Sequence, residues 1–282
     1  MNDGKATVPA NDTERGQGFT SQWPGEDPRQ PQASSSYRYL LDLDDDMAQE
    51  FDLRMRVVAR QVATVVVMDV PAAAQEAAEW FGAIGSGFGV LVIDGVVAVD
   101  TLVGDRVATE LVGAGDLLQP WEPGLDDLLD RRWEWRTLVP TRLALLDAAF
   151  AERVRPWPQI ANVLMRRASR RAGDLSVQRA ITCQPRLEVR LTLLLWHLAA
   201  RWGRVESGGI RVPLPLTHRL LGRLVGAERP SVSHALSRLS AAGLVTGHAD
   251  EWHLHGTPAS HLAALADRAD ASANTGAGTA DR

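Results

Sequence analysis

The fold is decided by residues 216–242, which read LTHRLLGRLVGAERPSVSHALSRLSAA. Leucines and valines recur at helical spacing on both sides of Gly226, where the pattern breaks. The pattern predicts two short helices joined by a tight turn. Gly222 has no side chain on the inner face of the first helix, so the second helix can cross close against it. Pro230 stands where the second helix can begin.

The second predicted helix leaves short polar and cationic side chains on its outer face. Donors of this kind suit phosphates and the base edges of a DNA major groove. The sequence therefore predicts a helix-turn-helix whose second helix contacts DNA, with a plain helical hairpin inside another domain as the alternative. The expected DNA-binding residues are Thr217, His218, Arg229, Ser231, Ser233, His234, Ser237 and Arg238.

A two-stranded wing is predicted directly after that helix, in residues 243–256. Leu244 begins one strand, residues 247–250 form a turn, and apolar and polar residues alternate over residues 251–255. The wing also carries His248, His253 and His255, which could hold a metal ion. No cysteine or carboxylate stands in register with them, so histidines placed near DNA phosphates are the simpler interpretation.

Length and composition limit the class of protein. The 282 residues suffice for two domains, and neither a long apolar run nor a signal-peptide pattern is present. Cys183 is the only cysteine, which excludes a disulfide framework and argues against an iron–sulfur cluster or a zinc finger. No catalytic motif is found. We expect a cytoplasmic protein that is not an enzyme, does not enter a membrane and has no certain cofactor.

Charge is distributed unevenly along the chain. The net charge is −5, which alone argues weakly against nucleic-acid binding. Residues 1–150 carry 12 Lys and Arg against 25 Asp and Glu, whereas residues 151–245 carry 16 Arg against 5 Asp and Glu. An acidic half followed by a basic half indicates that only the second half binds a polyanion.

The amino-terminal half is predicted to be mostly β-structure. Strands are expected within residues 57–68, 89–99, 106–112 and 137–146, with a helical insert over 72–81. Short strands at regular spacing with glycine turns at Gly95 and Gly104 are typical of an antiparallel barrel or jelly roll. A short helix is expected near Asp44, Asp45 and Asp46; these carboxylates could bind a divalent cation, but a solvated helix start is the preferred interpretation.

The middle of the chain is predicted to be helical. Prolines 156 and 158 divide residues 148–181 into a short helix and a long helix over 159–181. The apolar seam of the long helix would be Ile160, Leu164, Ala168, Leu175 and Ile181. Its basic run around Ser169 could be a phosphorylation site, but a solvated helix face is preferred. A further amphipathic helix is expected over 185–203, followed by a loop over 205–215.

The chain resembles the Crp/Fnr family of bacterial transcription regulators over roughly residues 55–256. The matching residues are the helix-turn-helix and wing, the stretch 91–99, the turn at Gly104 and the step Gly115-Asp116-Leu117. The resemblance implies an α+β protein with an amino-terminal antiparallel β-roll or jelly roll as sensor domain, a long dimerisation helix and a carboxy-terminal winged helix-turn-helix. It also implies a homodimer that binds double-stranded DNA and contacts RNA polymerase.

On this basis the chain is divided into five segments. They are a disordered leader (1–36), the β-roll sensor domain (37–147), the linking and dimerisation helices (148–183), the winged helix-turn-helix DNA-binding domain (184–256) and a mostly disordered tail (257–282).

The sequence departs from the family where members that bind cyclic nucleotides carry an Arg-Ser or Arg-Thr pair that holds the phosphate. That pair falls on Trp133 and Glu134, and a carboxylate would repel a phosphate. Cyclic AMP binding in the usual way is therefore not expected, and an unidentified small-molecule effector is the alternative. Its expected pocket residues are Asp116, Trp121, Trp133, Glu134, Arg136 and Thr137. The tryptophans could equally fill the interior of the roll.

The second departure is in the recognition helix. Arg229 and Ser233 match the family pattern, whereas Pro230 replaces a glutamate and His234 replaces an arginine. We expect a two-fold operator with an altered half-site, in which Arg229 and His234 contact bases and Ser231 and Ser233 contact phosphate. The alternative is a ligand-binding or protein-interaction module whose winged helix docks protein instead of DNA.

Overall fold

The computed structural model describes residues 34–73, 87–119, 131–248 and 250–277. Its amino-terminal part begins with β1 (Ser34–Tyr39), a 3₁₀ turn (Leu40–Asp42), α1 (Asp45–Gln49) and α2 (Leu53–Val62). The strands that follow are β2 (Thr64–Val70), β3 (Gly89–Asp94), β4 (Val96–Val103), β5 (Arg106–Gly113), β6 (Leu117–Leu118), β7 (Arg131–Thr137) and β8 (Thr141–Leu146).

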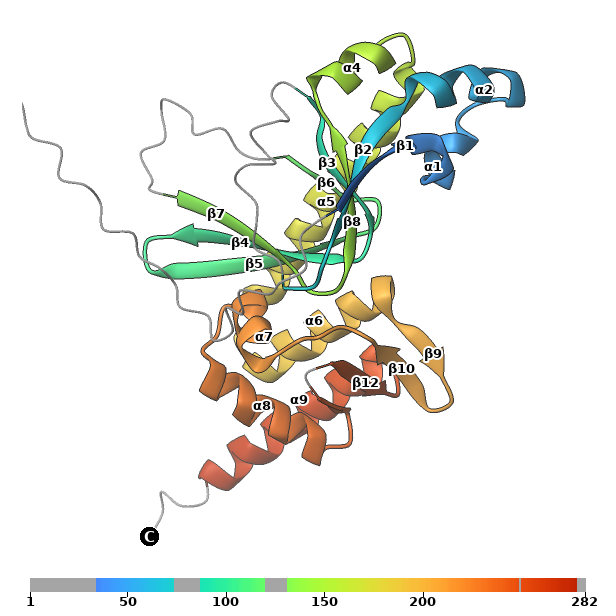
Figure 1. The fold of residues 1–282 in the computed structure, drawn as a ribbon. Coiled ribbons are helices and arrows are strands. Elements are labelled where there is room, and N and C mark those ends of the chain that lie inside the picture. Colours follow the sequence, from blue (N-terminus) through green and yellow to red (C-terminus); the bar gives the residue numbers. More distant parts are fainter. Residues whose placement is uncertain (1–33, 74–86, 120–130, 249, 278–282) are drawn as a thin grey trace, which may run out of the picture. The chain divides into compact units, whose positions relative to one another are not determined.

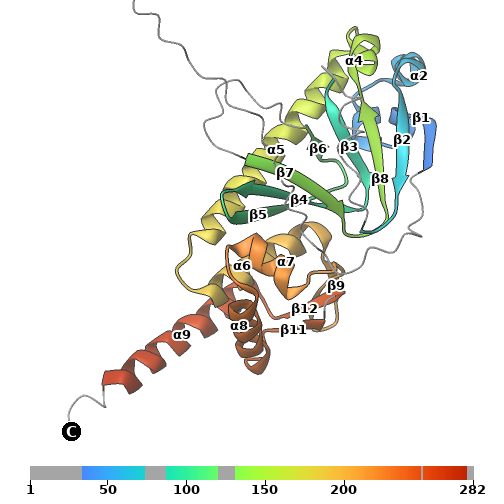
Figure 2. The ribbon, with the colours of Figure 1, turned by 60° about the vertical axis from the view of Figure 1, so that its left-hand side comes forward.

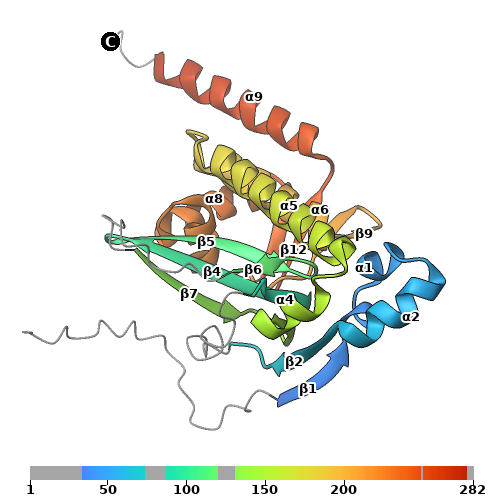
Figure 3. The ribbon, with the colours of Figure 1, turned by 90° about the horizontal axis from the view of Figure 1, so that it is seen from above.

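These strands form a roll of two antiparallel sheets. One sheet has the order β1-β2-β8-β3-β6 and the other the order β5-β4-β7, which Figure 3 shows as one layer. The chain crosses between the sheets at Gly95, whose positive φ of 94° suits glycine. Apolar side chains fill the space between the sheets, among them Val90, Val92, Val97, Val99, Trp135 and Leu143. The predicted antiparallel β-roll is confirmed.

Helices cover the outer face of the five-stranded sheet. α4 (Ala148–Val154) and the long α5 (Pro158–Thr182) follow β8, and Figure 2 shows α5 running alongside the roll toward α6. Phe150 of α4 and Ile160 and Leu164 of α5 are buried with Leu40 and Leu41. The roll therefore has a second apolar core on this side.

The carboxy-terminal part contains α6 (Leu187–Trp202), β9 (Arg204–Glu206), β10 (Gly209–Val212), α7 (His218–Val225), α8 (Arg229–Ala241), β11 (Val245–His248), β12 (Glu251–His255) and α9 (Pro258–Ala277). A third core joins α6, α7 and α8 and includes Val96 and Ala98 of β4. α7 lies against the β4–β5 layer (Figure 1). None of the helices in the described part combines the length and apolar character that a membrane span requires.

The strand predicted within residues 57–68 is only partly correct. Asp52 caps α2 by accepting hydrogen bonds from the backbone N–H groups of Arg54 and Met55, and the helix continues to Val62. β2 then begins at Thr64. Val57 and Val58, the first valines of that stretch, are exposed on α2, with Val57 at 63% exposure. A good N-cap therefore overrides β-branched residues here.

Two further segments differ from their predictions. The strand expected over 137–146 is two elements, because Thr137 ends β7 and β8 starts after Pro140. The loop expected over 205–215 contains the hairpin β9–β10, and β10 pairs with β12. The predicted two-stranded wing is thus part of a four-stranded sheet of order β11-β12-β10-β9.

The ends of the chain also differ from expectation. Residues 34–36 of the predicted disordered leader belong to β1, which pairs with β2. Residues 258–277 of the predicted disordered tail form α9, and His261 of this helix is fully buried. The helical insert expected over 72–81 and the side chain of Trp121 lie outside the described residues, apart from residues 72 and 73.

The long helix has the expected extent but not the expected seam. Of the expected seam, Ile160, Leu164 and Ile181 pack inside their own chain, whereas Ala168 and Leu175 are exposed. Met165 and Val177, which lie outside that seam, are exposed as well. Cys183, the C-cap of α5, is exposed.

The helix start at residues 44–46 was expected to be solvated, but only Asp45 and Asp46 are exposed. Asp44 caps α1 and is 8% exposed, because Arg167 of α5 forms an ion pair with its carboxylate.

Candidate nucleic-acid interface

Two helices form the centre of the candidate interface. α7 begins after Thr217, whose hydroxyl accepts a hydrogen bond from the backbone N–H of Leu220 at 3.2 Å, and ends at Gly226 in a left-handed conformation. α8 has Pro230 in its first turn, where a missing N–H leaves no hydrogen bond unmade. The buried residues that join the helices are Leu220, Leu221, Leu224, Val225, Val232, Ala235, Leu236 and Leu239. The helix-turn-helix predicted from the sequence is confirmed.

Gly222 of α7 allows the turn after this helix to lie close against it. Its carbonyl accepts a hydrogen bond from the backbone N–H of Ala227 at 2.8 Å. A Cβ atom at Gly222 would overlap the backbone oxygen of Ala227, and it would also contact Val232 of α8. A backbone atom cannot move aside as a flexible side chain can.

Replacing Gly222 with alanine is expected to destabilise the domain by about 1–2 kcal/mol, although alanine favours helices by about 1 kcal/mol. Urea denaturation measures the change. Gly173→Ala in α5 is the matched control, because a Cβ there meets nothing within 4 Å; that variant should be stabilised by roughly 0.5–1 kcal/mol. Equal stability changes in the two variants would contradict the close-approach argument.

The outer face of α8 gathers most of the predicted contact residues. Arg229, Ser231, His234, Ser237 and Arg238 are all exposed. Positions three and four apart share one face of a helix, so Ser231, His234 and Arg238 form a stripe. This surface is not packed into the interior of the chain.

Other predicted contact residues already have structural partners. The Ser233 hydroxyl donates to the backbone oxygen of Arg229 at 3.1 Å and lies 2.8 Å from Nδ1 of His218. The Ser237 hydroxyl donates to the backbone oxygen of Ser233 at 3.0 Å, and Arg238 forms an ion pair with Glu188 of α6. Ser233 and His218 therefore hold α7 and α8 together.

The wing is braced by polar contacts. Thr246 Oγ1 and His255 Nε2 lie 2.9 Å apart, and His253 Nε2 lies 3.4 Å from Glu251. Arg211 of β10 pairs with Glu206 at 2.5 Å and with Glu251 at 3.4 Å. Within the described ranges, no three His, Cys, Asp or Glu side chains are grouped so that they could hold a metal ion. The side chain of His248 is not described.

Ion pairs connect the roll to α7 and α8. Arg223 of α7 donates to Asp100 of β4 at 2.6 Å, and Asp100 is only 4% exposed. Glu228, the N-cap of α8, lies 3.2 Å from Arg106 at the start of β5. Burial lowers the pKa of Arg136 on β7, and the neighbouring Arg223 guanidinium adds to this effect although Asp100 opposes it.

The comparison with protein families bears on the two helices and the wing together. The family described as the Crp-like helix-turn-helix domain matches residues 189–255, which span α6 through β12. The chain carries a Crp-like helix-turn-helix domain. No curated protein matches the chain.

Solved structures resemble most of this chain in fold. A CooA mutant from Carboxydothermus hydrogenoformans is 16% identical with a TM-score of 0.54, over 79% of this chain and 92% of that one. The c-di-GMP-responsive regulator CLP of Xanthomonas campestris is 20% identical with a TM-score of 0.53, over 76% and 100%. A CRP/FNR-family regulator from Thermus thermophilus is 18% identical with a TM-score of 0.50, over 70% and 97%. At these identities the likeness is one of fold. The predicted resemblance is thus supported by the family match in residues 189–255 and, over most of the chain, by a likeness of fold.

The described residues of the predicted effector pocket lie in two environments, Asp116 beside α5 and α6 and the others on β7. On β7, Thr137 is buried and Trp133 partly buried, both on the face of Trp135, and Glu134 is exposed on the opposite face. The Thr137 hydroxyl donates to the backbone oxygen of Pro71 at 2.6 Å.

Asp116 belongs to a different environment. Its carboxylate lies 2.6 Å from Arg201 of the Crp-like domain. No sequence motif indicated that these two residues meet. Trp121 lies outside the described residues. The buried Asp100 was also missed. The one sequence feature that could have indicated it is a carboxylate among the mostly apolar residues of β4.

Proposed function

We propose that this chain is a sequence-specific DNA-binding transcription regulator of the Crp/Fnr type. The observation that carries the proposal is the second helix of a Crp-like helix-turn-helix domain, which buries its apolar side and exposes Arg229, Ser231, His234 and Arg238. The domain lies in the part of the chain with an excess of arginine, and neutralising phosphates requires such cations. A regulator of this kind needs no catalytic activity and works in the cytoplasm.

The proposal assigns different roles to the predicted contact residues. Arg229 and His234 contact base edges, because both are exposed and both carry ring or guanidinium donors. Ser231 and Arg238 contact phosphates, with Arg238 exchanging Glu188 for the DNA backbone. His218 and Ser233 position the two helices against each other, whereas Thr217 caps α7 and the Ser237 hydroxyl bonds within α8.

We also propose that the DNA-binding form is a homodimer. Met165 and Val177 of α5 are exposed apolar side chains, and α5 corresponds to the helix through which the Crp/Fnr resemblance implies dimerisation. A two-fold dimer would recognise two half-sites about one helical turn apart. RNA polymerase is the expected further partner when the dimer is bound at a promoter. The sensor roll does not hold cyclic AMP in the usual way, because Trp133 stands at the position of the family's phosphate-binding arginine and packs with the apolar core beside Trp135.

Selection of bound sequences from random duplex DNA, followed by anisotropy titrations of the selected site, tests the proposal. The affinity of the full chain should fall linearly with salt on a double-logarithmic plot, because phosphate contacts release counterions. Arg229→Ala and His234→Ala should each weaken binding by roughly 5- to 100-fold and relax the preference at one position of each half-site.

Arg54→Ala is the matched control, since Arg54 lies on α2 of the roll and should leave DNA binding unchanged. Full affinity and unchanged base preference in both α8 variants would refute the residue assignment. If the chain binds no duplex in a salt-dependent way, the result favours the alternative of a winged helix that docks protein.

A further inference from the structure

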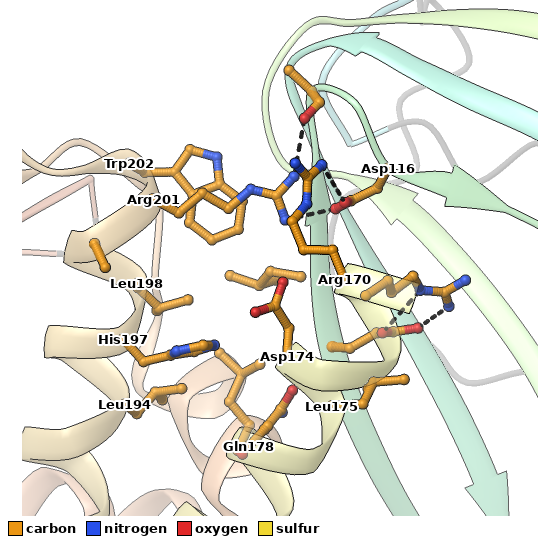
Figure 4. A pocket seen from close by; sticks show the side chains of 16 residues that line it. Asp116, Arg170, Asp174, Leu175, Gln178, Leu194, His197, Leu198, Arg201 and Trp202 are labelled. Carbon is orange, nitrogen blue, oxygen red and sulfur yellow. Dashed lines mark hydrogen bonds and ion pairs between the residues drawn. The ribbon is translucent and has the colours of Figure 1, made fainter. Parts of the chain in front are cut away.

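A cavity of about 380 Å³ lies between β5, α5 and α6, outside the roll interior and away from the outer face of α8. Figure 4 shows that the side chains around it come from both α5 and α6 and from the loop that holds Asp116. The volume is in the range of small-molecule sites, roughly 300–1,000 Å³. Asp116 is the one described residue of the predicted effector pocket that lines this cavity, and no predicted DNA-contact residue lines it.

One end of the cavity has more positive than negative charge around Asp116. This carboxylate is 1% exposed; Oδ2 accepts from the backbone N–H of Gly113 at 3.0 Å and lies 2.6 Å from Arg201. Oδ1 has no hydrogen-bond partner, and Arg170 is 3.7 Å away from it. Two guanidinium groups thus face one carboxylate, and Arg170, whose side chain is 52% exposed, retains donors for an anionic group.

The other end offers acceptors. Asp174 follows Arg170 by one helical turn, is half-buried and points into the space between α5 and α6, where His197 points toward it (Figure 4). Within the described part of the chain, neither Asp174 nor His197 makes a hydrogen bond or ion pair. The amide nitrogen of Gln178 already donates to the backbone oxygens of Thr109 at 2.6 Å and Leu224 at 3.3 Å, so its amide oxygen remains as an acceptor.

The remaining wall is apolar. Leu175, Leu194, Leu198 and Trp202 line it, and the Trp202 ring lies 4.8 Å below the guanidinium of Arg201. A ligand that fits must therefore carry an anionic group, a cationic group a few ångströms away and an apolar body.

We infer that this cavity binds a free α-amino acid with an apolar side chain. The carboxylate of the amino acid pairs with Arg170, its ammonium donates to Asp174 and Gln178, and its side chain packs on Leu194 and Leu198. A simple phosphate would leave Asp174 unpaired, and a metal ion would find only one carboxylate and one imidazole there. Because Arg170 stands at one end and Asp174 at the other, the cavity favours a ligand with both a negative and a positive group.

The location of the cavity links ligand binding to the domain arrangement. Asp116 belongs to the roll, whereas Arg201 and His197 belong to the Crp-like domain, so an occupant contacts both. A ligand that binds only this arrangement stabilises it by mass action. An effect of the amino acid on DNA affinity rests on the proposed function, but binding of the amino acid itself does not.

Calorimetric titration of the full chain with leucine and with phenylalanine, in the absence of DNA, tests the inference. We expect saturable binding of at least one of them, with N-acetyl-leucine and leucinamide bound roughly tenfold more weakly or worse, because each analogue loses one charged hydrogen-bonding group. Asp174→Asn should weaken binding of the amino acid to a similar degree, and so should Arg170→Gln. Ser176→Ala, on the exposed side of α5, is the matched control and should bind as the wild type does.

Circular dichroism and the melting temperature without ligand show whether each variant is folded. If neither amino acid binds the folded wild type, or if folded Asp174→Asn binds with wild-type affinity, the assignment of the cavity is wrong. Because no DNA is present, either result leaves the proposed regulator function untouched.

Discussion

Asp44→Asn is expected to lose about 3–5 kcal/mol of unfolding free energy, because it leaves the buried Arg167 guanidinium without its main counterion. Both side chains of this pair are 7% exposed, and Arg167 Nη2 lies 2.7 Å from Asp44 Oδ1. Burial alone would lower the pKa of Arg167, but the hydrogen bonds and charge of Asp44, with a contribution from Asp46, raise it. Asparagine can still cap α1 in place of Asp44, so the loss reports the charge and not the cap.

Urea denaturation followed by circular dichroism measures the effect. Asp46→Asn is the control: this carboxylate is 81% exposed and 3.6 Å from Arg167, and its loss should cost less than about 1 kcal/mol. The double variant Asp44→Asn with Arg167→Met should recover part of the stability, because it buries no unpaired charge. A wild-type midpoint for Asp44→Asn would show that the pair contributes nothing.

Asp100→Asn is expected to destabilise the junction between the roll and α7 by about 2–3 kcal/mol, the range for hydrogen bonds to charged groups. Asp100 accepts from the Thr109 hydroxyl across the β4–β5 pairing and from Arg223 at 2.6 Å. The Arg223 side chain is 22% exposed, so the loss should be smaller than at Asp44. Amide hydrogen exchange in α7 should accelerate more than exchange in α4.

Asp105→Asn provides the matched control for that experiment. Asp105 lies in the β4–β5 turn, is 90% exposed and is 3.8 Å from Arg106. Its replacement should leave both the denaturation midpoint and the exchange of α7 unchanged. Equal effects of the two substitutions would show that the buried carboxylate does not connect the roll to α7.

The helix-turn-helix could be predicted because its signals are local. The spacing of leucines, the break at Gly226 and the position of Pro230 each report on neighbouring residues, and the structure keeps all three. The same holds for the long helix after Pro158, where proline starts the helix.

Elements whose identity depends on distant partners were missed. β9 and β10 are short, and β10 is a strand because β12 lies beside it. Val57 and Val58 read as a strand, but their helix is set by the cap at Asp52 and leaves both exposed. α9 has weak helical signals, and the fully buried His261 holds it through the backbone oxygen of His255 at 2.5 Å and the Trp196 indole at 3.2 Å.

In the candidate sites, too, local features could be predicted from the sequence and contacts with other side chains or backbone groups could not. Exposure of Arg229, Ser231 and His234 follows from the helix period alone. The hydrogen bonds of Ser233 and Ser237 to the preceding turn could not be predicted, since serine can either back-bond or face outward. Asp116 was expected in the roll, yet its partners come from α5 and α6, more than fifty residues further along the chain.

The single cysteine of the chain stands at the end of α5, in contact with solvent. A thiol-specific fluorophore or spin label would therefore attach at one known point without prior mutagenesis. In a symmetric dimer the two labels would give one separation per molecule. Any change in how the carboxyl ends of the two α5 helices lie relative to each other would change that separation.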